Sequence, residues 1–226
     1  MNQNPNLTLP AARQAPVIMS ELIQAAEALS HIGPAVSIFG SARITADSPY
    51  YALSHSLGTQ LAKAGFAVIA GGGPGVMEGA NKGAFEANGT SVGLNIKLPV
   101  EKKNNPYQTV SLSFEYFYSR KATFFLHSMA YVALPGGYGT LDELFETLTL
   151  IQTGKLAKGP VILMGSSFWQ GLVKWMQTEL LPINLITQDH LDLFIIEDDP
   201  AEVVKMIELF TTTNLQNTNL PISLPK

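Results

Sequence analysis

The chain has 226 residues, of which 46% are hydrophobic, so it is long enough to bury a core without disulfides or a structural metal. It contains no cysteine, which excludes a thiolate nucleophile and a zinc–cysteine site and fits a reducing compartment. A net charge of −4 without a dense Lys/Arg run argues against nucleic acid or an anionic membrane as the main partner. A small-molecule ligand is therefore expected.

The two ends of the chain differ from its middle. Residues 1–18 are polar, contain prolines and lack the apolar core of a signal peptide, so they are predicted to form a flexible N-terminal arm. Residues 213–226 are rich in Asn, Thr and Pro and are predicted to be a flexible C-terminal tail. Residues 19–212 remain as a single domain. No apolar run approaches the ~20 residues that span a bilayer, so no membrane partner and a cytoplasmic location are expected.

Short β-rich segments alternate with helical patterns along this domain. The predicted strands cover residues 35–40, 67–70, 91–96, 109–114, 131–134, 161–164 and 193–196. The predicted helices run from Ser20 to Gly33, over 49–64, up to Ala87, over 114–128, from Thr140 past Ile151, and over 168–181 and 200–210. Alternation of this kind requires an open parallel sheet, here of about seven strands, with helices on both faces. The fold class is therefore α/β.

The segment LPGGYGTLDELFE, residues 134–146, follows a strand and opens a strongly periodic helix. Its three glycines, Gly136, Gly137 and Gly139, allow the backbone to approach a bound group closely. Free N–H groups and the positive end of the helix dipole favour an anion there, so a phosphate is the expected occupant. Glu143 next to such a site indicates chemistry beside the phosphate. The alternative is structural, because Thr140 and Glu143 have the spacing of a capping box.

A second glycine turn lies in GGGPGVMEGAN, where Pro74 suits the first turn of a helix. Gly73, Gly75 and Gly79 also match a weak dinucleotide fingerprint. However, the next strand ends near Asn95 without the acidic residue that would hold an NAD ribose. The alternative is a purely structural role, as a tight turn packed against the sheet. Two such turns in one sheet predict a cleft for a phosphate and a sugar.

Three segments together resemble a known family: GGGPGVMEGANKGA, the pair Arg120-Lys121, and LPGGYGTLDELFETLTLIQTG. They are similar to the Lonely Guy (LOG) family of cytokinin-activating nucleoside-5′-monophosphate phosphoribohydrolases, many of which have been labelled "lysine decarboxylase-like". The resemblance covers about residues 35–177, and LPVEKKNNPY and TLIQTGK look like the longer bacterial and algal branch. It implies a Rossmann-like fold, a homodimer or dimer-built hexamer, no cofactor, and release of base and ribose 5-phosphate from an adenine nucleotide.

The resemblance also assigns residues. It places the catalytic pair on Arg120 and Glu143, where a carboxylate can stabilise an oxocarbenium-like transition state and a guanidinium can hold phosphate or position the carboxylate. Glu143 and Thr149 are six residues apart, about 240° around a helix, so both reach one pocket only if the helix start is irregular or a second subunit intervenes. The predicted substrate-binding residues are Ser41, Gly72, Gly73, Gly75, Met77, Glu101, Lys121, Pro135, Gly136, Gly137, Tyr138, Gly139, Thr140 and Thr149.

Two other classes of function remain open. A pyridoxal-phosphate decarboxylase needs a Schiff-base lysine in a dry pocket, and Lys82 and Lys121 are the only lysines near the turns. A nucleotide-binding protein without turnover would have less use for both members of the Arg120–Glu143 pair. The four histidines are scattered without ligand spacing, so no metal site is expected.

Overall fold

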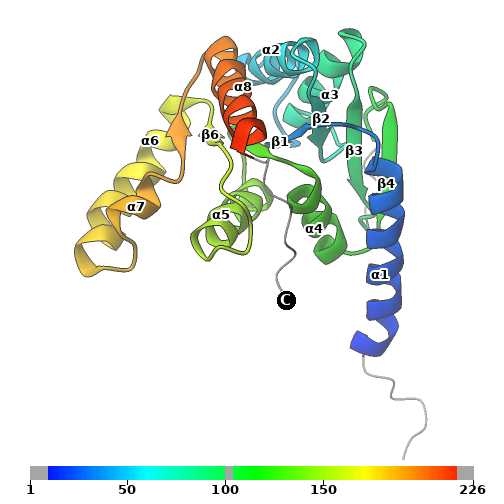
Figure 1. Cartoon of the computed structure of the whole chain (residues 1–226), viewed down its shortest axis with the longest axis horizontal. Coiled ribbons are helices and arrows are strands. Elements are labelled where there is room, and N and C mark those ends of the chain that lie inside the picture. Colours follow the sequence, from blue (N-terminus) through cyan, green and yellow to red (C-terminus); the bar gives the residue numbers. More distant parts are fainter. Residues whose placement is uncertain (1–9, 100–103, 218–226) are drawn as a thin grey trace, which may run out of the picture.

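The computed structural model of the chain describes residues 10–99 and 104–217 (Figure 1). Seven parallel strands form one sheet in the order β4-β3-β2-β1-β5-β6-β7, which confirms the predicted open α/β sheet. The strands are β1 (Ala35–Phe39), β2 (Ala67–Ala70), β3 (Ser91–Ile96), β4 (Val110–Phe114), β5 (Ala130–Ala133), β6 (Val161–Leu163) and β7 (Ile195–Ile196).

Helices cover both faces of the sheet. On one face lie α1 (Pro10–Leu29), α4 (Phe117–His127), α5 (Tyr138–Gln152) and α6 (Ser166–Trp175). The other face is covered by α2 (Pro49–Lys63), α3 (Val76–Glu86) and α8 (Pro200–Asn217). After α6, a π-helical turn (Met176–Leu180), a 3-10 turn (Leu181–Ile183) and the short α7 (Gln188–Leu191) lead to β7. This arrangement is the predicted Rossmann-like fold.

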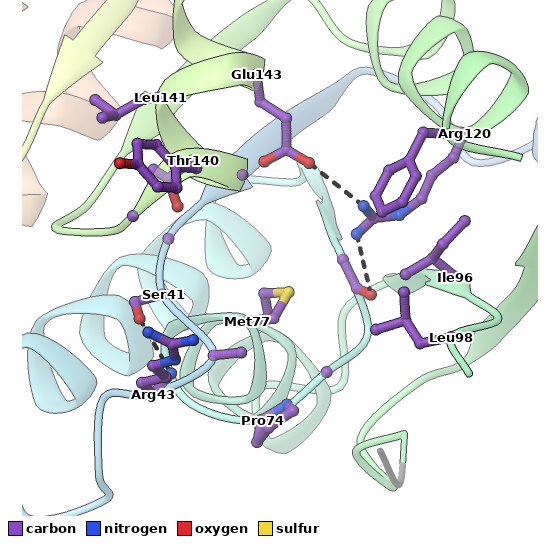
Figure 2. Close-up of a pocket in the computed structure, with 18 of the residues that line it drawn as sticks. Ser41, Arg43, Pro74, Met77, Ile96, Leu98, Arg120, Thr140, Leu141 and Glu143 are labelled. Atoms are coloured by element: carbon purple, nitrogen blue, oxygen red, sulfur yellow. Dashed lines mark hydrogen bonds and ion pairs between the residues drawn. The ribbon is translucent and has the colours of Figure 1, made fainter. Parts of the chain in front are cut away.

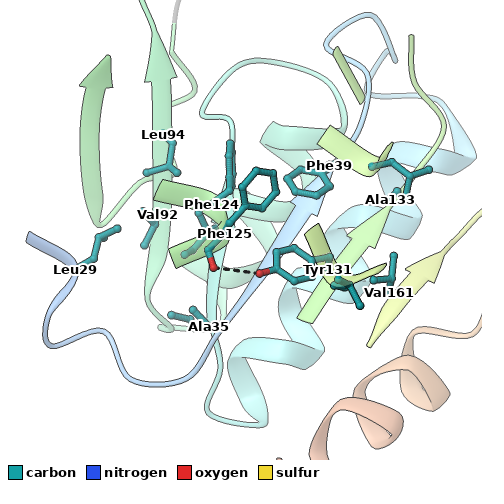
Figure 3. Packing of buried hydrophobic residues seen from close by; sticks show 14 of the residues in the cluster. Leu29, Ala35, Phe39, Val92, Leu94, Phe124, Phe125, Tyr131, Ala133 and Val161 are labelled. Atoms are coloured by element: carbon teal, nitrogen blue, oxygen red, sulfur yellow. Dashed lines mark hydrogen bonds between the residues drawn. The ribbon is translucent and has the colours of Figure 1, made fainter. Parts of the chain in front are cut away.

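The central strands are buried on both sides because alternate residues face opposite helical layers. In β1, Val36 and Ile38 belong to the layer with α2 and α3, while Phe39 belongs to the layer with α4. Figure 3 shows this second layer, where the ring of Phe39 packs edge-on against Phe124, with the ring centroids 5.3 Å apart. The hydroxyl of buried Tyr131 donates to the carbonyl of Phe125 at 3.2 Å, so the aromatic core also satisfies its polar atom.

Two helices are longer than their sequence patterns predict. Helix α1 begins at Pro10, so the part of the predicted arm from residue 10 to 18 is helical; residues 1–9 lie outside the described residues. Proline is tolerated in the first turn of a helix, and the Ala-, Arg- and Gln-containing sequence that follows has high helix propensity. Pro10 is the first helical residue, whereas Pro16 lies inside the helix without ending it.

The last helix also continues past its predicted end at residue 210, into the first residues of the predicted tail. Helix α8 continues to Asn217, and residues 218–226 lie outside the described part. Its threonines each donate a hydroxyl hydrogen bond to the carbonyl four residues earlier, at 2.7 Å for Thr211, 2.9 Å for Thr212 and 2.8 Å for Thr213. The hydroxyls are therefore satisfied inside the helix instead of drawing the chain into a turn.

The strand order places the ligand-binding edge of the sheet. From β1 the chain winds through β2 and β3 to β4, and it then returns to β5 on the other side of β1. The direction of winding therefore reverses between β1 and β5. Ligands of such sheets bind beyond the carboxyl ends of the strands at this reversal. The loop after β1, the glycine turn after β2 and the glycine turn after β5 all lie at this edge.

Candidate active site

A cavity of about 550 Å³ lies at the carboxyl edge of β1, β2, β3 and β5 (Figure 2). A cavity of this size suits a small-molecule ligand. It is lined by residues from the loop after β1, both glycine turns, the end of β3 and helices α4 and α5: Gly40, Ser41, Ala42, Arg43, Gly71, Gly73, Pro74, Met77, Ile96, Leu98, Asn104, Phe117, Arg120, Gly137, Tyr138, Gly139, Thr140, Leu141 and Glu143. Both predicted catalytic residues line it.

Helix α5 starts earlier than its sequence pattern predicts, and the capping box is wrong. Its N-cap is Gly137, without a side-chain cap, so Thr140 is the third helical residue instead of the cap. Glycine's flexibility permits this early start, and the carbonyl of Gly137 accepts the N–H of Leu141 at 3.0 Å. Glu143 therefore lies in the second turn of the helix, where it has no capping task.

Glu143 faces Arg120 inside the cavity, as Figure 2 shows. Arg120 Nη1 and Glu143 Oε1 are 3.5 Å apart, and the two side chains are only 7% and 13% exposed. Arg120 is also held by backbone carbonyls: Nε donates to Leu94 at 2.7 Å and Nη2 to Gly71 at 3.4 Å. These carbonyls lie in β3 and just after β2. The guanidinium is thus fixed to the sheet while one nitrogen faces the carboxylate.

Burial perturbs the ionisation of this pair. It raises the pKa of the Glu143 carboxyl from its ordinary 4.5 to about 7, because removal from water penalises the charged form more than Arg120 favours it. The neighbouring carboxylates of Asp142 and Glu146 act in the same direction as burial, and Lys121 acts against it. Burial also lowers the pKa of Arg120, and Glu143 opposes that shift. A cleft carboxyl that titrates near neutral pH is suited to proton transfer.

The turn after β2 is held from outside the cavity by Asn105 and Gln108. The carbonyl of Gly72 accepts the Asn105 N–H at 2.8 Å and the Gln108 Nε2 at 3.0 Å, and Asn105 Nδ2 donates to Gly73 at 3.0 Å. Gly72 has a φ of +73° that favours glycine. Since these carbonyls point away from the cavity, the turn can present N–H groups to a ligand. Gly72 and Gly75 shape the turn without lining the cavity.

Other predicted site residues lie away from the cavity. Lys121 pairs with Asp142 at 3.0 Å and with Glu146 at 2.6 Å, which joins α4 to α5. Burial lowers the pKa of Lys121, but these two carboxylates together outweigh burial and raise it. Thr149 is exposed and donates its hydroxyl to Phe145 at 2.7 Å. Pro135 and Gly136 precede the lining residues, and Glu101 lies outside the described residues.

Some residues that line the cavity are not among the predicted site residues. Arg43 follows β1, the strand at the winding reversal, and this position could have identified it. The apolar lining residues Ile96, Leu98 and Phe117 come from the end of β3, the segment after it and the start of α4. They carry no motif, so only the fold brings them together.

Residues 10–99 and 104–217 contain neither a metal-binding cluster nor a membrane-spanning helix. Within them, no group of three or more His, Asp or Glu side chains is arranged to hold a metal ion. No helix there combines the length and apolar character needed to cross a membrane.

The chain is similar to a family of known proteins and to several of its named members. A family model described as "Possible lysine decarboxylase" matches residues 77–224. The cytokinin riboside 5'-monophosphate phosphoribohydrolase LOG5 of Arabidopsis thaliana is 27% identical over 65% of this chain, and the match spans 64% of LOG5, less than two thirds of its length. The cytokinin riboside 5'-monophosphate phosphoribohydrolase of Mycobacterium marinum is 29% identical over 65% of this chain and 79% of its own.

A solved structure gives the same result for the fold. The molybdenum cofactor binding protein from Rippkaea orientalis superposes with a TM-score of 0.60 at 22% identity, covering 79% of this chain and 97% of that protein. At this identity the similarity establishes the fold alone. The family model, by contrast, covers more than half of the sequence and includes the Arg120-Lys121 pair and the glycine turn after β5. The chain therefore belongs to the LOG family, whose family model carries the description "Possible lysine decarboxylase".

Proposed function

We propose that this protein hydrolyses the N-glycosidic bond of adenine or cytokinin nucleoside 5′-monophosphates and releases the free base and ribose 5-phosphate. The observation that carries the proposal is the buried Arg120–Glu143 pair in a cavity bordered by two glycine turns. The names of the relatives from Arabidopsis thaliana and Mycobacterium marinum support the same reaction.

Glu143 supplies the carboxylate for this reaction. As the bond between the base and C1′ breaks, positive charge develops on the sugar, and a nearby carboxylate stabilises it. The same group can take a proton from the attacking water, whose hydroxyl adds to C1′ while the base leaves with the bonding electrons and gains a proton. A pKa of about 7 gives Glu143 enough basicity for this step and leaves it substantially ionised at neutral pH.

Arg120 is best suited to positioning Glu143. Two of its three guanidinium nitrogens are committed to the carbonyls of Leu94 and Gly71, which leaves Nη1 for the carboxylate. A guanidinium can satisfy these separate directions because its donors are fixed in a plane. A lysine ammonium in its place has one nitrogen and cannot reach all three acceptors.

The remaining cavity walls suit the two ends of a nucleotide. The turns at Gly73 and Gly137–Thr140 offer backbone donors to a phosphate. Ile96, Leu98 and Phe117 form an apolar wall for a flat base. The preference for a prenylated or an unmodified base is set by the apolar contact that this wall makes with the base.

The decarboxylase alternative finds little support. Among the described residues, no lysine lines the cavity. Lys82 lies over the ring of Tyr107 at 5.4 Å and near Glu86, and Lys121 is paired with two carboxylates. Neither is placed in the dry pocket that a Schiff base requires.

We also propose that the protein is cytoplasmic and forms a homodimer or a dimer-built hexamer. Helices α4 and α5 expose large apolar side chains, including Tyr118 at 67% and Leu126 at 71%. Thr149 lies one helical turn after the exposed Phe145, so both belong to the same face of α5. A contact through these helices would give Thr149 the second subunit that its position requires.

Incubation of the purified protein with AMP, followed by chromatography for free adenine, tests the function. Adenine and ribose 5-phosphate in equal amounts are expected. Lysine with pyridoxal phosphate should give no cadaverine. Tight AMP binding without adenine release would instead favour a binding protein without turnover.

A further inference from the structure

Arg43 is a cation of the cavity that the Arg120–Glu143 pair does not use. The charged side chains among the described lining residues are Arg43, Arg120 and Glu143. Arg120 and Glu143 are paired with each other, whereas the Arg43 guanidinium has no ion pair or side-chain hydrogen bond among residues 10–99 and 104–217. Its donors are therefore open to a ligand, and the described lining carries one positive charge in excess.

The loop that carries Arg43 is fixed between the two glycine turns. Ser41 donates its N–H to the carbonyl of Pro135, just before the turn after β5, at 3.1 Å. Its carbonyl accepts the N–H of Val76, at the start of α3, also at 3.1 Å. The Ser41 hydroxyl then accepts the N–H of Arg43 at 3.0 Å, which stabilises the loop locally. Arg43 thus extends from a loop that is hydrogen-bonded to the segments beside both glycine turns.

The cavity separates its charges. Figure 2 shows Ser41 and Arg43 together on the side of the cavity away from Arg120. A phosphate near Glu143 would suffer repulsion from the carboxylate, whereas a phosphate on the Arg43 side avoids it. Arg120 cannot take the phosphate in a two-pronged contact, because Nε and Nη2 already serve backbone carbonyls.

We infer that Arg43 binds the 5′-phosphate of the substrate, together with the backbone donors of the two glycine turns. This inference rests on the proposed function, because it names the phosphate-binding side chain of the same site. It adds a charged side chain to the backbone N–H groups that are expected to hold most of the anion. An arginine fork matches two phosphate oxygens at once, and its exposed position lets it meet the phosphate at the cavity mouth.

Binding measurements test this without relying on turnover. Calorimetry with ribose 5-phosphate, and with AMP in a Glu143→Gln background, should show affinity about tenfold weaker or worse for Arg43→Ala. Arg43→Lys should retain part of the affinity, since it keeps the charge and loses the fork. Adenosine binding should change less than twofold. Lys174→Ala, which removes an exposed cation on α6, is the matched control and should bind like the parent.

The outcomes separate this inference from the proposed function. Arg43-dependent binding of ribose 5-phosphate without any AMP hydrolysis would support the phosphate assignment and reject the reaction. AMP hydrolysis with unchanged affinity in a folded Arg43→Ala protein would do the reverse. The inference is also overturned if adenosine loses as much affinity as AMP, or if the parent protein does not bind ribose 5-phosphate.

Discussion

Replacing Glu143 by glutamine keeps the shape of the side chain and removes its ionisation. A glutamine oxygen can still accept from Arg120 Nη1, so the variant should fold. Hydrolysis of AMP should fall at least ~100-fold, the scale of a lost acid–base or electrostatic group. The same substitution should also change how the stability of the protein depends on pH.

The size and sign of that change follow from the pKa. In the folded protein Glu143 has a pKa of about 7, against an ordinary value of 4.5 for the unfolded chain. The folded state therefore binds the proton more tightly, and this contribution to stability is complete below pH 4.5 and lost as pH rises through 7. A difference of about 2.5 pH units corresponds to about 3 kcal/mol. Wild type should lose that amount, relative to Glu143→Gln, between pH 4 and pH 8.

Urea unfolding of both proteins across this range measures the effect, with AMP hydrolysis followed on the same samples. Subtracting the two stability curves cancels every other titrating group. Glu179→Gln, which removes an exposed carboxylate outside the cavity, is the control for the loss of one acidic side chain. If the two curves stay parallel within about 0.5 kcal/mol, Glu143 is not perturbed by burial and the reasoning from its environment fails.

The remaining predictions concern the rest of the cavity. Arg120→Ala should abolish hydrolysis and Arg120→Lys should rescue it poorly; a lysine variant with most of the wild-type kcat would reduce the residue to a generic charge. AMP should be cleaved far better than adenosine, and equal kcat/KM values for the two substrates would contradict the assignment of the phosphate to the glycine turns. Gly137→Ala and Gly139→Ala should raise KM, because an added Cβ meets no protein atom within 4 Å and enters the space for the ligand; Gly171→Ala on α6 meets none either and should be neutral. Asn105→Ala should raise KM for AMP more than it lowers kcat, since it releases the turn after β2; an unchanged KM in a folded variant would contradict that role.

Much of the fold could be predicted because its signals are local. Apolar strands alternating with amphipathic helices already require a parallel sheet, and the seven strands lie within a few residues of their expected positions. The end of a helix depends on weaker terms. Pro10 and the threonines of α8 do not by themselves mark where a helix begins or ends. A proline fits a helix if it lies in the first turn, and a threonine fits if its hydroxyl donates to the carbonyl four residues earlier.

The site likewise contains residues that a sequence motif predicts and residues that only the fold brings together. The glycine turns and the Arg120–Glu143 pair have a motif, and the structure brings them to one cavity. Lys121 follows Arg120 directly in the sequence, yet a helix turns successive side chains by about 100°, which directs Lys121 to the carboxylates of α5. Arg43 lacks a motif and is distant in sequence from both turns. Its contribution could be found only from the position of β1 in the sheet.

Helix α1 also has a consequence for the outer strand of the sheet. Glu21 accepts the backbone N–H of Glu115, immediately after β4, at 2.6 Å, and it also accepts the hydroxyl of Ser119 on α4. Strand β4 is an end strand, and unprotected end strands can recruit other chains into intermolecular sheets. The opposite end strand, β7, is only two residues long and offers little backbone for such pairing. Glu21 thus fixes α1 at the carboxyl end of this longer end strand and occupies the backbone N–H that follows it. Shortening the chain past Glu21 should therefore promote self-association before it affects chemistry, so the N-terminal segment belongs in any preparation used for kinetics.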